Sequence, residues 1–346
     1  YKKRENTIGR FPFQVSLYEG FRWESISKYR ISYFLQIHII IMIKYFTALV
    51  SLLLLNSCLK DEPFKNEYEG YEPTTIHDDW IISTPEEEEI ERSKLEQAYR
   101  LLYNDSRFWM ARSLLVIRNG KLVAEAYPHD LSDRDQFANI QSCTKTFTSI
   151  LLGIAIEDRV DISIDDKLYD IYPGLFDENH LKRKITIRDA LTMQTGLEYN
   201  NDVNTLQLYQ TELNSAGFVL SLPYLYEPGT VMNYNDGAPQ LVSKAIETKT
   251  GMTESEYAGL KLFQPLNITD WKWESAHDGT TFGAFSLYLK PRDFAKVGQL
   301  LLQKGKWEDL QIINEEYLTL ATSHLVNSKL NSPYGFYFWI DEKNQG

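Results

Sequence analysis

Apolar side chains recur at helical spacing through a long stretch near the middle of the chain. Residues three and four apart lie on one face of a helix, and the apolar positions here keep that spacing: Thr146, Phe147, Ile150, Leu151, Ile154 and Ala155. The pattern predicts a largely apolar helix. A serine and a lysine three residues apart, Ser142 and Lys145, stand at its start.

A second helix is predicted upstream, where a shorter apolar stripe follows a run of acidic residues. The stripe consists of Leu95, Ala98, Tyr99 and Leu102. Thr84 is a good N-cap, Pro85 suits the first helical position, and Glu86 to Glu89 complement the positive end of the helix dipole. The sequence therefore predicts a helix that begins at residue 84 or 85.

Strands are predicted on both sides of the mostly helical region. Residues 111–117 and 122–127 flank Asn119-Gly120, a strong signal for a two-residue hairpin turn. Residues 334–340 are typical of a buried strand, and the sequence between these strands predicts mostly helices. Outer strands with a helical insertion predict an α/β fold, in which an antiparallel sheet flanked by terminal helices lies beside an all-α subdomain.

A secretory signal is predicted from Met42 onward. A short basic region, an apolar region and small residues precede Cys58, which is the layout of a signal peptide. Residues 55–58 resemble a bacterial lipobox, in which Cys58 is lipidated and becomes the mature N-terminus. A signal anchor is the alternative, because residues 34–55 are long and apolar enough to span a bilayer. Both interpretations predict an exported protein, held at a membrane in the periplasm or at the cell surface.

The signal divides the chain into four predicted parts. They are an upstream extension of the reading frame (1–41), the lipoprotein signal peptide (42–58), an acidic tether (59–79) and a catalytic domain (80–346). The only other cysteine is Cys143, so no structural disulfide is available if Cys58 carries lipid. Cys143 is interpreted as a small buried apolar residue.

Charge excludes a nucleic-acid partner. The whole chain has a formal net charge of −12, yet residues 1–58 contain eight Lys or Arg and three Asp or Glu. Subtracting this +5 leaves about −17 on the remainder. Such a surface repels nucleic acid, and the basic leader belongs to the signal.

Ser142 and Lys145 are the candidate nucleophile and base. At this spacing the Lys145 amine can reach the Ser142 hydroxyl, which is a poor nucleophile without a base. Lysine acts as a base only where burial or a nearby cation favours its neutral form. Ser142 also stands at the N-terminus of the predicted helix, where backbone N–H groups favour developing negative charge. The motif alone also fits a Ser N-cap followed by a solvated lysine.

Five segments carry a resemblance to a known family. In chain order they are residues 114–123, 142–145, 187–197, 228–230 with Tyr234, and 289–300. With these segments the chain, from about Asp79 onward, resembles the penicillin-recognising serine hydrolases, the group of class C β-lactamases, esterases and aminohexanoate-dimer hydrolases. The Gly-Gln-Leu at the end of the last segment is most similar to the aminohexanoate-dimer hydrolase branch.

The resemblance implies a β-lactamase/transpeptidase-like fold with the active site at the seam between two lobes. It also implies a Lys/His-x-Gly strand soon after residue 340, which carries part of the oxyanion hole. That strand and the C-terminal helix are therefore expected to be missing from the sequence as given.

Tyr234 is the tyrosine that the resemblance assigns to catalysis. The family pattern is Tyr-x-Asn, in which the tyrosine shares base duty with the lysine and the amide helps to hold lysine and substrate. This chain has Tyr234-Asn235-Asp236, with an acid in place of the amide. A carboxylate beside Lys145 favours the charged ammonium and makes it a poorer base. A packed loop aromatic is the alternative interpretation of Tyr234.

Other candidate residues carry weaker signals. Tyr199 and Asn200 follow the Thr195-Gly196-Leu197 match and are candidates, with Asp236, to bind substrate; a solvated loop is the alternative. No metal site is predicted, because the six histidines are scattered and no Cys/His cluster has zinc-binding spacing. No cofactor is required by the chemistry above.

The predicted function is that of an exported serine hydrolase that forms an acyl-enzyme at Ser142. Its substrate is a small-molecule or peptide amide or ester. A β-lactamase or D-alanyl peptidase that acts on cell-wall peptides is the alternative among enzymes. A catalytically silent, penicillin-binding-like lipoprotein is the alternative outside them, favoured by Asp236 and by the missing Lys/His-x-Gly motif.

Overall fold

The computed structural model describes residues 65–341. The predicted upstream extension, the signal peptide and Cys58 lie outside these described residues. Within residues 65–341, no helix combines the length and the apolar character that a membrane span needs.

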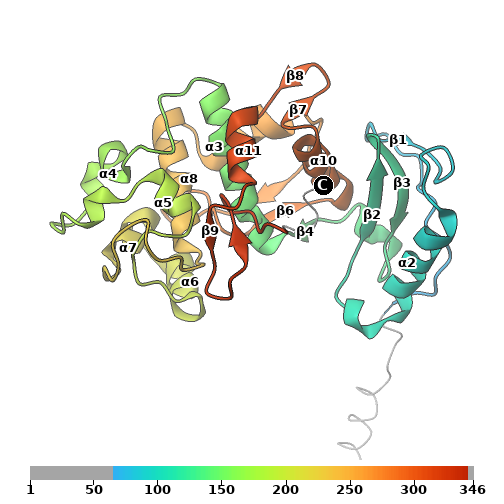
Figure 1. The fold of residues 1–346 in the computed structure, drawn as a ribbon, viewed down its shortest axis with the longest axis horizontal. Coiled ribbons are helices and arrows are strands. Elements are labelled where there is room, and N and C mark those ends of the chain that lie inside the picture. The colour runs from blue at the N-terminus through green and yellow to red at the C-terminus, as the bar shows by residue number, and fades with distance from the viewer. Residues whose placement is uncertain (1–64, 342–346) are drawn as a thin grey trace, which may run out of the picture. The chain divides into compact units, whose positions relative to one another are not determined.

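A small sheet forms the N-terminal part of the described chain (Figure 1). Strands β2 (Leu114–Arg118) and β3 (Lys121–Ala126) pair antiparallel, and β1 (Ile81–Ile82) pairs parallel with β3. The turn between β2 and β3 is Asn119-Gly120, with φ angles of 51° and 76°. Positive φ at both turn residues is what a type I′ hairpin requires, and the predicted hairpin is confirmed.

Helix α2 (Arg92–Asn104) packs on this sheet but begins later than predicted. Its buried residues are Leu95, Tyr99 and Leu102, whereas Ala98 is exposed. Residues 85–89 form turns instead of helix, because Glu89 has a left-handed φ of 57°. The Glu88 carboxylate accepts hydrogen bonds from Lys121 and Asn119 at 2.7 and 2.8 Å. The prediction of a helix start at Thr84 is therefore wrong.

Part of the predicted tether lies against the same sheet. The Tyr71 side chain is 1% exposed, and its ring centroid is 5.1 Å from that of Tyr99. The Tyr71 carbonyl accepts a hydrogen bond from the Glu125 backbone N–H at 2.8 Å. The Asn66 N–H likewise donates to the Pro128 carbonyl at 2.7 Å, so the segment contacts the domain ahead of the predicted boundary at residue 80.

The central helix is α3 (Thr144–Glu157), which packs against α8 (Gly237–Thr250) in the largest apolar cluster. The other helices of this part are α4 (Leu168–Ile171), α5 (Ile187–Leu191), α6 (Asn201–Gln210), α7 (Ser215–Ser221) and α9 (Glu254–Ala258). Helices α5 and α7 also contact α8. The predicted all-α subdomain is confirmed.

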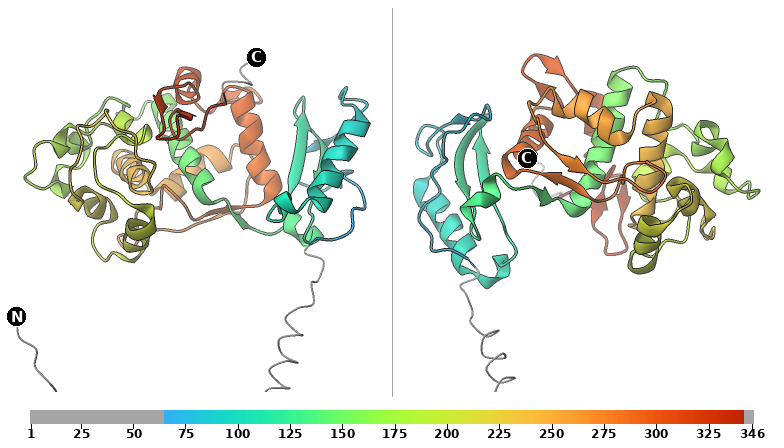
Figure 2. Two further views of the ribbon diagram at one scale, coloured as in Figure 1. Left: turned by 60° about the horizontal axis from the view of Figure 1, so that its bottom comes forward. Right: turned by 180° about the vertical axis from the view of Figure 1, so that it is seen from behind.

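Helix α10 (Pro291–Leu302) lies between the N-terminal sheet and the helices around α3 and α8. It contacts β2, and its Phe294 ring lies 6.0 Å from that of Phe147 on α3. Figure 2 shows α10 between α3 and the β2–β3 hairpin. A second sheet leads into both helices, and its strand order is β4 (Ala138–Asn139), β6 (Leu287–Leu289) and β5 (Lys272–Trp273).

The remaining short elements complete the α/β fold. They are β7 (Lys306–Trp307), β8 (Leu310–Gln311), α11 (Glu315–Ala321), β9 (Val326–Asn327) and β10 (Pro333–Tyr334).

The seven-residue strand predicted for residues 334–340 is wrong. Only Pro333–Tyr334 is a strand, and the chain then folds back so that Tyr334 bridges to Trp339. Tyr337 has a left-handed φ of 64°, and the Gly335 N–H donates to the Phe338 carbonyl at 2.8 Å. The apolar run is buried as a packed turn, which its hydrophobicity alone does not distinguish from a strand.

Candidate active site

Ser142 lies in a tight connection between strand β4 and helix α3. The Asn139 side chain accepts a hydrogen bond from the Gln141 N–H at 2.8 Å, and Gln141 has a left-handed φ of 51°. A positive φ at a residue other than glycine is a strained conformation that is common at functional sites. A single 3₁₀ turn follows, Gln141–Cys143, and leaves Ser142 exposed.

Lys145 lies in the first turn of α3 and is 1% exposed. Its Nζ is 3.0 Å from Ser142 Oγ, 2.7 Å from Asp236 Oδ1 and 3.1 Å from the Ala284 carbonyl oxygen. An ammonium group has three N–H donors and no acceptor. Three acceptors at hydrogen-bond distance therefore match a charged Lys145 that donates to Ser142.

Asp236 is the N-cap residue of α8 and the counter-ion of Lys145. Its second oxygen, Oδ2, accepts a hydrogen bond from Thr205 Oγ1 at 2.7 Å, and its backbone N–H donates to Asn201 Oδ1 at 3.1 Å. Both carboxylate oxygens thus have partners. A buried ion pair needs such additional hydrogen bonds to offset the loss of solvation.

Tyr234 faces Lys145 with its ring. The Lys145 Nζ is 5.1 Å from the ring centroid, a cation–π distance. The ring also contacts Tyr334 and Trp339, with centroids 6.2 and 5.5 Å away. Among the described residues, no hydrogen bond joins the Tyr234 hydroxyl to Ser142 or Lys145. The structure therefore brings Tyr234 to the predicted site, and also packs it as a loop aromatic.

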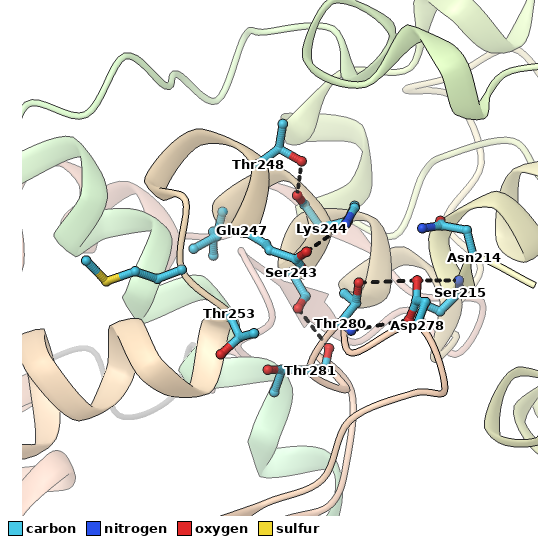
Figure 3. Close-up of polar contacts among 12 residues, drawn as sticks. Asn214, Ser215, Ser243, Lys244, Glu247, Thr248, Thr253, Asp278, Thr280 and Thr281 are labelled. Carbon is cyan, nitrogen blue, oxygen red and sulfur yellow. Dashed lines mark hydrogen bonds and ion pairs between the residues drawn. The ribbon is translucent and has the colours of Figure 1, made fainter.

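The Ala284 carbonyl belongs to a loop that several polar contacts hold in place (Figure 3). The Ser215 N–H donates to Asp278 Oδ2 at 2.9 Å, and the Ser243 hydroxyl donates to the Thr281 carbonyl at 2.8 Å. On the other side, the Thr148 hydroxyl of α3 donates to the Gly283 carbonyl at 2.8 Å. These bonds fix the third acceptor of Lys145 relative to α3, α7 and α8.

The two weaker candidates, Tyr199 and Asn200, line a cavity of about 440 Å³ together with Tyr234. Tyr199 is largely buried, and a Cβ on Gly237 would come within 2.5 Å of its ring. The Asn200 side chain caps α6 by accepting from the Asp202 N–H at 2.9 Å. Both residues have structural contacts, and their binding of substrate stays a prediction.

Cys143 differs from the prediction. It is exposed and faces a largely apolar groove of about 610 Å³ lined by β2 and α10. Partial desolvation in this groove raises the pKa of the thiol, so it is not a thiolate at neutral pH. The prediction of a buried residue is wrong, because the short turn before α3 directs residue 143 away from the core.

The sequence did not single out Thr205, Asn201 or Ala284. Thr205 and Asn201 stand 31 and 35 positions before Asp236, and Ala284 stands 139 positions after Lys145. No local pattern marks them, because their contacts arise where α6, α8 and the loop before β6 meet. Within the described residues, no group of three or more His, Cys, Asp or Glu is arranged to hold a metal ion.

Comparison with known proteins points to one family. A family model described as Beta-lactamase matches residues 111–321. Three solved structures share the fold: a 6-aminohexanoate-dimer hydrolase from Bacillus anthracis, a penicillin-binding protein homologue from Caulobacter crescentus and a penicillin-binding protein from Bacillus halodurans.

The three solved structures are distant in sequence. The B. anthracis protein is 19% identical, with a TM-score of 0.62 over 82% of this chain and 78% of that one. The C. crescentus protein is 13% identical, with a TM-score of 0.58 over 73% and 81%. The B. halodurans protein is 19% identical, with a TM-score of 0.52 over 67% and 80%. At such identities the likeness speaks for the fold and not for a shared substrate.

Proposed function

The chain belongs to the beta-lactamase family, and from this premise we propose that it cleaves an amide or ester bond through an acyl-enzyme at Ser142. One observation carries the proposal: Lys145 Nζ lies 3.0 Å from Ser142 Oγ at the start of α3. A nucleophile and a base within hydrogen-bond reach, with the base held by a third group, form the arrangement that covalent catalysis needs.

The proposed reaction moves one proton out of the serine and one into the leaving group. In its neutral form Lys145 accepts the Ser142 proton, and Oγ bonds to the carbonyl carbon of the substrate. The bond from that carbon to the leaving nitrogen or oxygen breaks, Tyr234 delivers a proton to the leaving atom, and the Lys145 ammonium passes the serine proton on to Tyr234. The Ser142 N–H is one donor to the oxyanion. Water then hydrolyses the acyl-serine ester and restores the hydroxyl.

Covalent labelling tests the proposal. The full chain should react with a fluorophosphonate probe at Ser142, and Ser142→Ala should lower the labelling rate by a factor on the order of 10⁴ or more. Cys143→Ala is the matched control, because Cys143 is the exposed neighbour of Ser142, and its labelling should equal that of the wild type. Equal labelling of Ser142→Ala would exclude Ser142 as the nucleophile. A chain that no probe labels would favour the silent, cell-wall-binding alternative.

We also propose that the protein is exported and anchored through lipid on Cys58. The proposal rests on the signal-like text from Met42 and on the lipobox-like residues 55–58. In a bacterial host the protein should sediment with membranes and incorporate labelled palmitate, and Cys58→Ser should abolish incorporation. A product that stays unlabelled, or that behaves alike after Cys58→Ser, would contradict the anchor.

A further inference from the structure

We propose that Thr205 is a positioning residue that orients the Asp236 carboxylate toward Lys145 and thereby sets the protonation of Lys145. The inference rests on the proposed function in one respect, since it concerns the group that takes the Ser142 proton. The family resemblance assigns no role to α6, and the contacts of this helix point to one.

The Asp236 carboxylate is divided between two partners. Oδ1 accepts from Lys145 Nζ and Oδ2 accepts from Thr205 Oγ1, each at 2.7 Å. A carboxylate with one partner can rotate about its Cβ–Cγ bond, whereas partners at both oxygens fix the plane of the group. The Thr205 hydroxyl thus keeps Oδ1 directed at Lys145.

Helix α6 also holds the backbone of the same loop. Asn201 lies one turn before Thr205 on the same helix face. Its Oδ1 accepts from the Asp236 N–H at 3.1 Å, and its Nδ2 contacts the Tyr234 carbonyl at 3.5 Å. One helix therefore fixes both the backbone and the side chain of Asp236.

The far end of α6 reaches the loop that supplies the other acceptor of Lys145. The Tyr209 ring stacks on Phe282 with centroids 5.4 Å apart and planes at 14°, and Phe282 stands two residues before Ala284. Leu208 is fully buried and anchors the helix in the main apolar cluster. Helix α6 therefore contacts both loops that supply acceptors to Lys145, the one with Asp236 and the one with Ala284.

The ionisable groups around the pair are few. From the other elements the pair is faced by Tyr234 and Tyr199, and Cys143 adjoins Lys145. Burial raises the pKa of Tyr199 and desolvation raises the pKa of Cys143, so both are neutral at pH 7. Asp236 is the anion in hydrogen-bond contact with Lys145. Its orientation therefore controls how strongly the ammonium form is favoured.

Titration of Lys145 in the full chain tests the inference without any substrate. Lysine labelled with ¹³C at the ε position gives a resonance for Lys145, assigned by its loss in Lys145→Arg. Thr205→Val removes the hydroxyl and keeps the shape, so the midpoint of this resonance should fall by about half a unit to one pH unit. Thr205→Ser should restore the wild-type midpoint. If Thr205→Val does not fold, Thr205→Ala replaces it with the same expectation.

Thr248→Val is the matched control. Thr248 is exposed, and among the described residues its hydroxyl bonds only within α8, to the Lys244 carbonyl at 2.7 Å (Figure 3). The Lys145 midpoint should not move in this variant. In an Asp236→Asn background, Thr205→Val should have no further effect on the midpoint.

An unchanged midpoint in Thr205→Val, or an equal shift in Thr205→Ser, would overturn the inference. Fluorophosphonate labelling of the same samples reports separately on Ser142. A shifted midpoint with no labelling would therefore leave the Thr205 role standing and remove the hydrolase proposal, whereas labelling with an unmoved midpoint would do the reverse.

Discussion

Two ion pairs of this protein are buried to a similar degree but differ in the groups that surround the cation. The Lys145 and Asp236 side chains are 2% and 14% exposed, and those of Arg292 and Glu125 are 3% and 5% exposed. The acceptors around Arg292 are structural: the Arg292 Nε donates to Glu125 at 2.9 Å, and its terminal nitrogens donate to Asp78 at 2.9 Å and to the Thr74 carbonyl at 2.7 Å. One of the three acceptors around Lys145 is instead the Ser142 hydroxyl.

The difference lies in what each cation can do. A guanidinium stays protonated and holds several acceptors in a fixed fork, so Arg292 ties α10 to β3 and to residues 74–78. A lysine ammonium can lose its proton when its surroundings allow. In the proposed function, the groups around Lys145 therefore set how readily it accepts the Ser142 proton. Both pairs lie within the residues that the family model matches. What separates them is the set of hydrogen-bond partners, which suits a stabilising role for Arg292 and the proposed catalytic role for Lys145.

Breaking the structural pair should have the larger effect on stability. Arg292→Met leaves Glu125 buried without its cation, and we expect the free energy of unfolding to fall by about 3–5 kcal/mol. Urea unfolding followed by circular dichroism measures the change. Arg92→Met is the control, since Arg92 and its partner Glu86 are 55% and 59% exposed, and a surface pair contributes at most about 1 kcal/mol.

The loss of unfolding free energy in Arg292→Met should also depend on pH. Burial by itself raises the pKa of Glu125, but hydrogen bonds from Arg292, Thr74 and Tyr127 outweigh it, and the pKa is lowered. In the wild type this stabilisation is present above the unfolded pKa and is lost as the pH falls through the folded one. Without Arg292 the Glu125 pKa rises, so the variant should lose more stability at pH 7 than at pH 4. A deficit that is equal at both pH values would show that Arg292 acts through packing alone.

The Lys145 pair should respond in activity more than in stability. Asp236→Asn removes the charge that favours the ammonium, and its amide oxygen can still accept from Lys145. We expect ester hydrolysis at neutral pH to rise about tenfold, equal to about 1.4 kcal/mol in the barrier, and the pH at which hydrolysis is fastest to fall. Rates of a chromogenic ester between pH 6 and 10 measure both changes. A large loss of activity would mean that the carboxylate takes part in the reaction.

Local predictions from the sequence succeeded where short-range geometry decides the outcome. The Asn119-Gly120 turn can adopt two positive φ angles at little cost, so the β2–β3 hairpin follows from adjacent residues. The apolar spacing from Phe147 to Ile154 likewise identifies α3. Predictions failed where a distant partner competes with local preference. Glu88 turns inward to Lys121, 33 positions away, and the acidic run before α2 does not become helix.

The sequence by itself placed Ser142 and Lys145 within reach of each other, because residues three apart around a helix start are neighbours. Through the resemblance to a family motif it also identified Tyr234 as the matching tyrosine and Asp236 as the departure from the motif. Only the tertiary structure decided what surrounds the lysine. Asp236 and Ala284 stand 91 and 139 positions from Lys145, and Thr205 comes from a different helix. Their contacts depend on how α3, α6 and α8 pack, and the period of apolar residues specifies which face each helix buries but not which polar group meets it there.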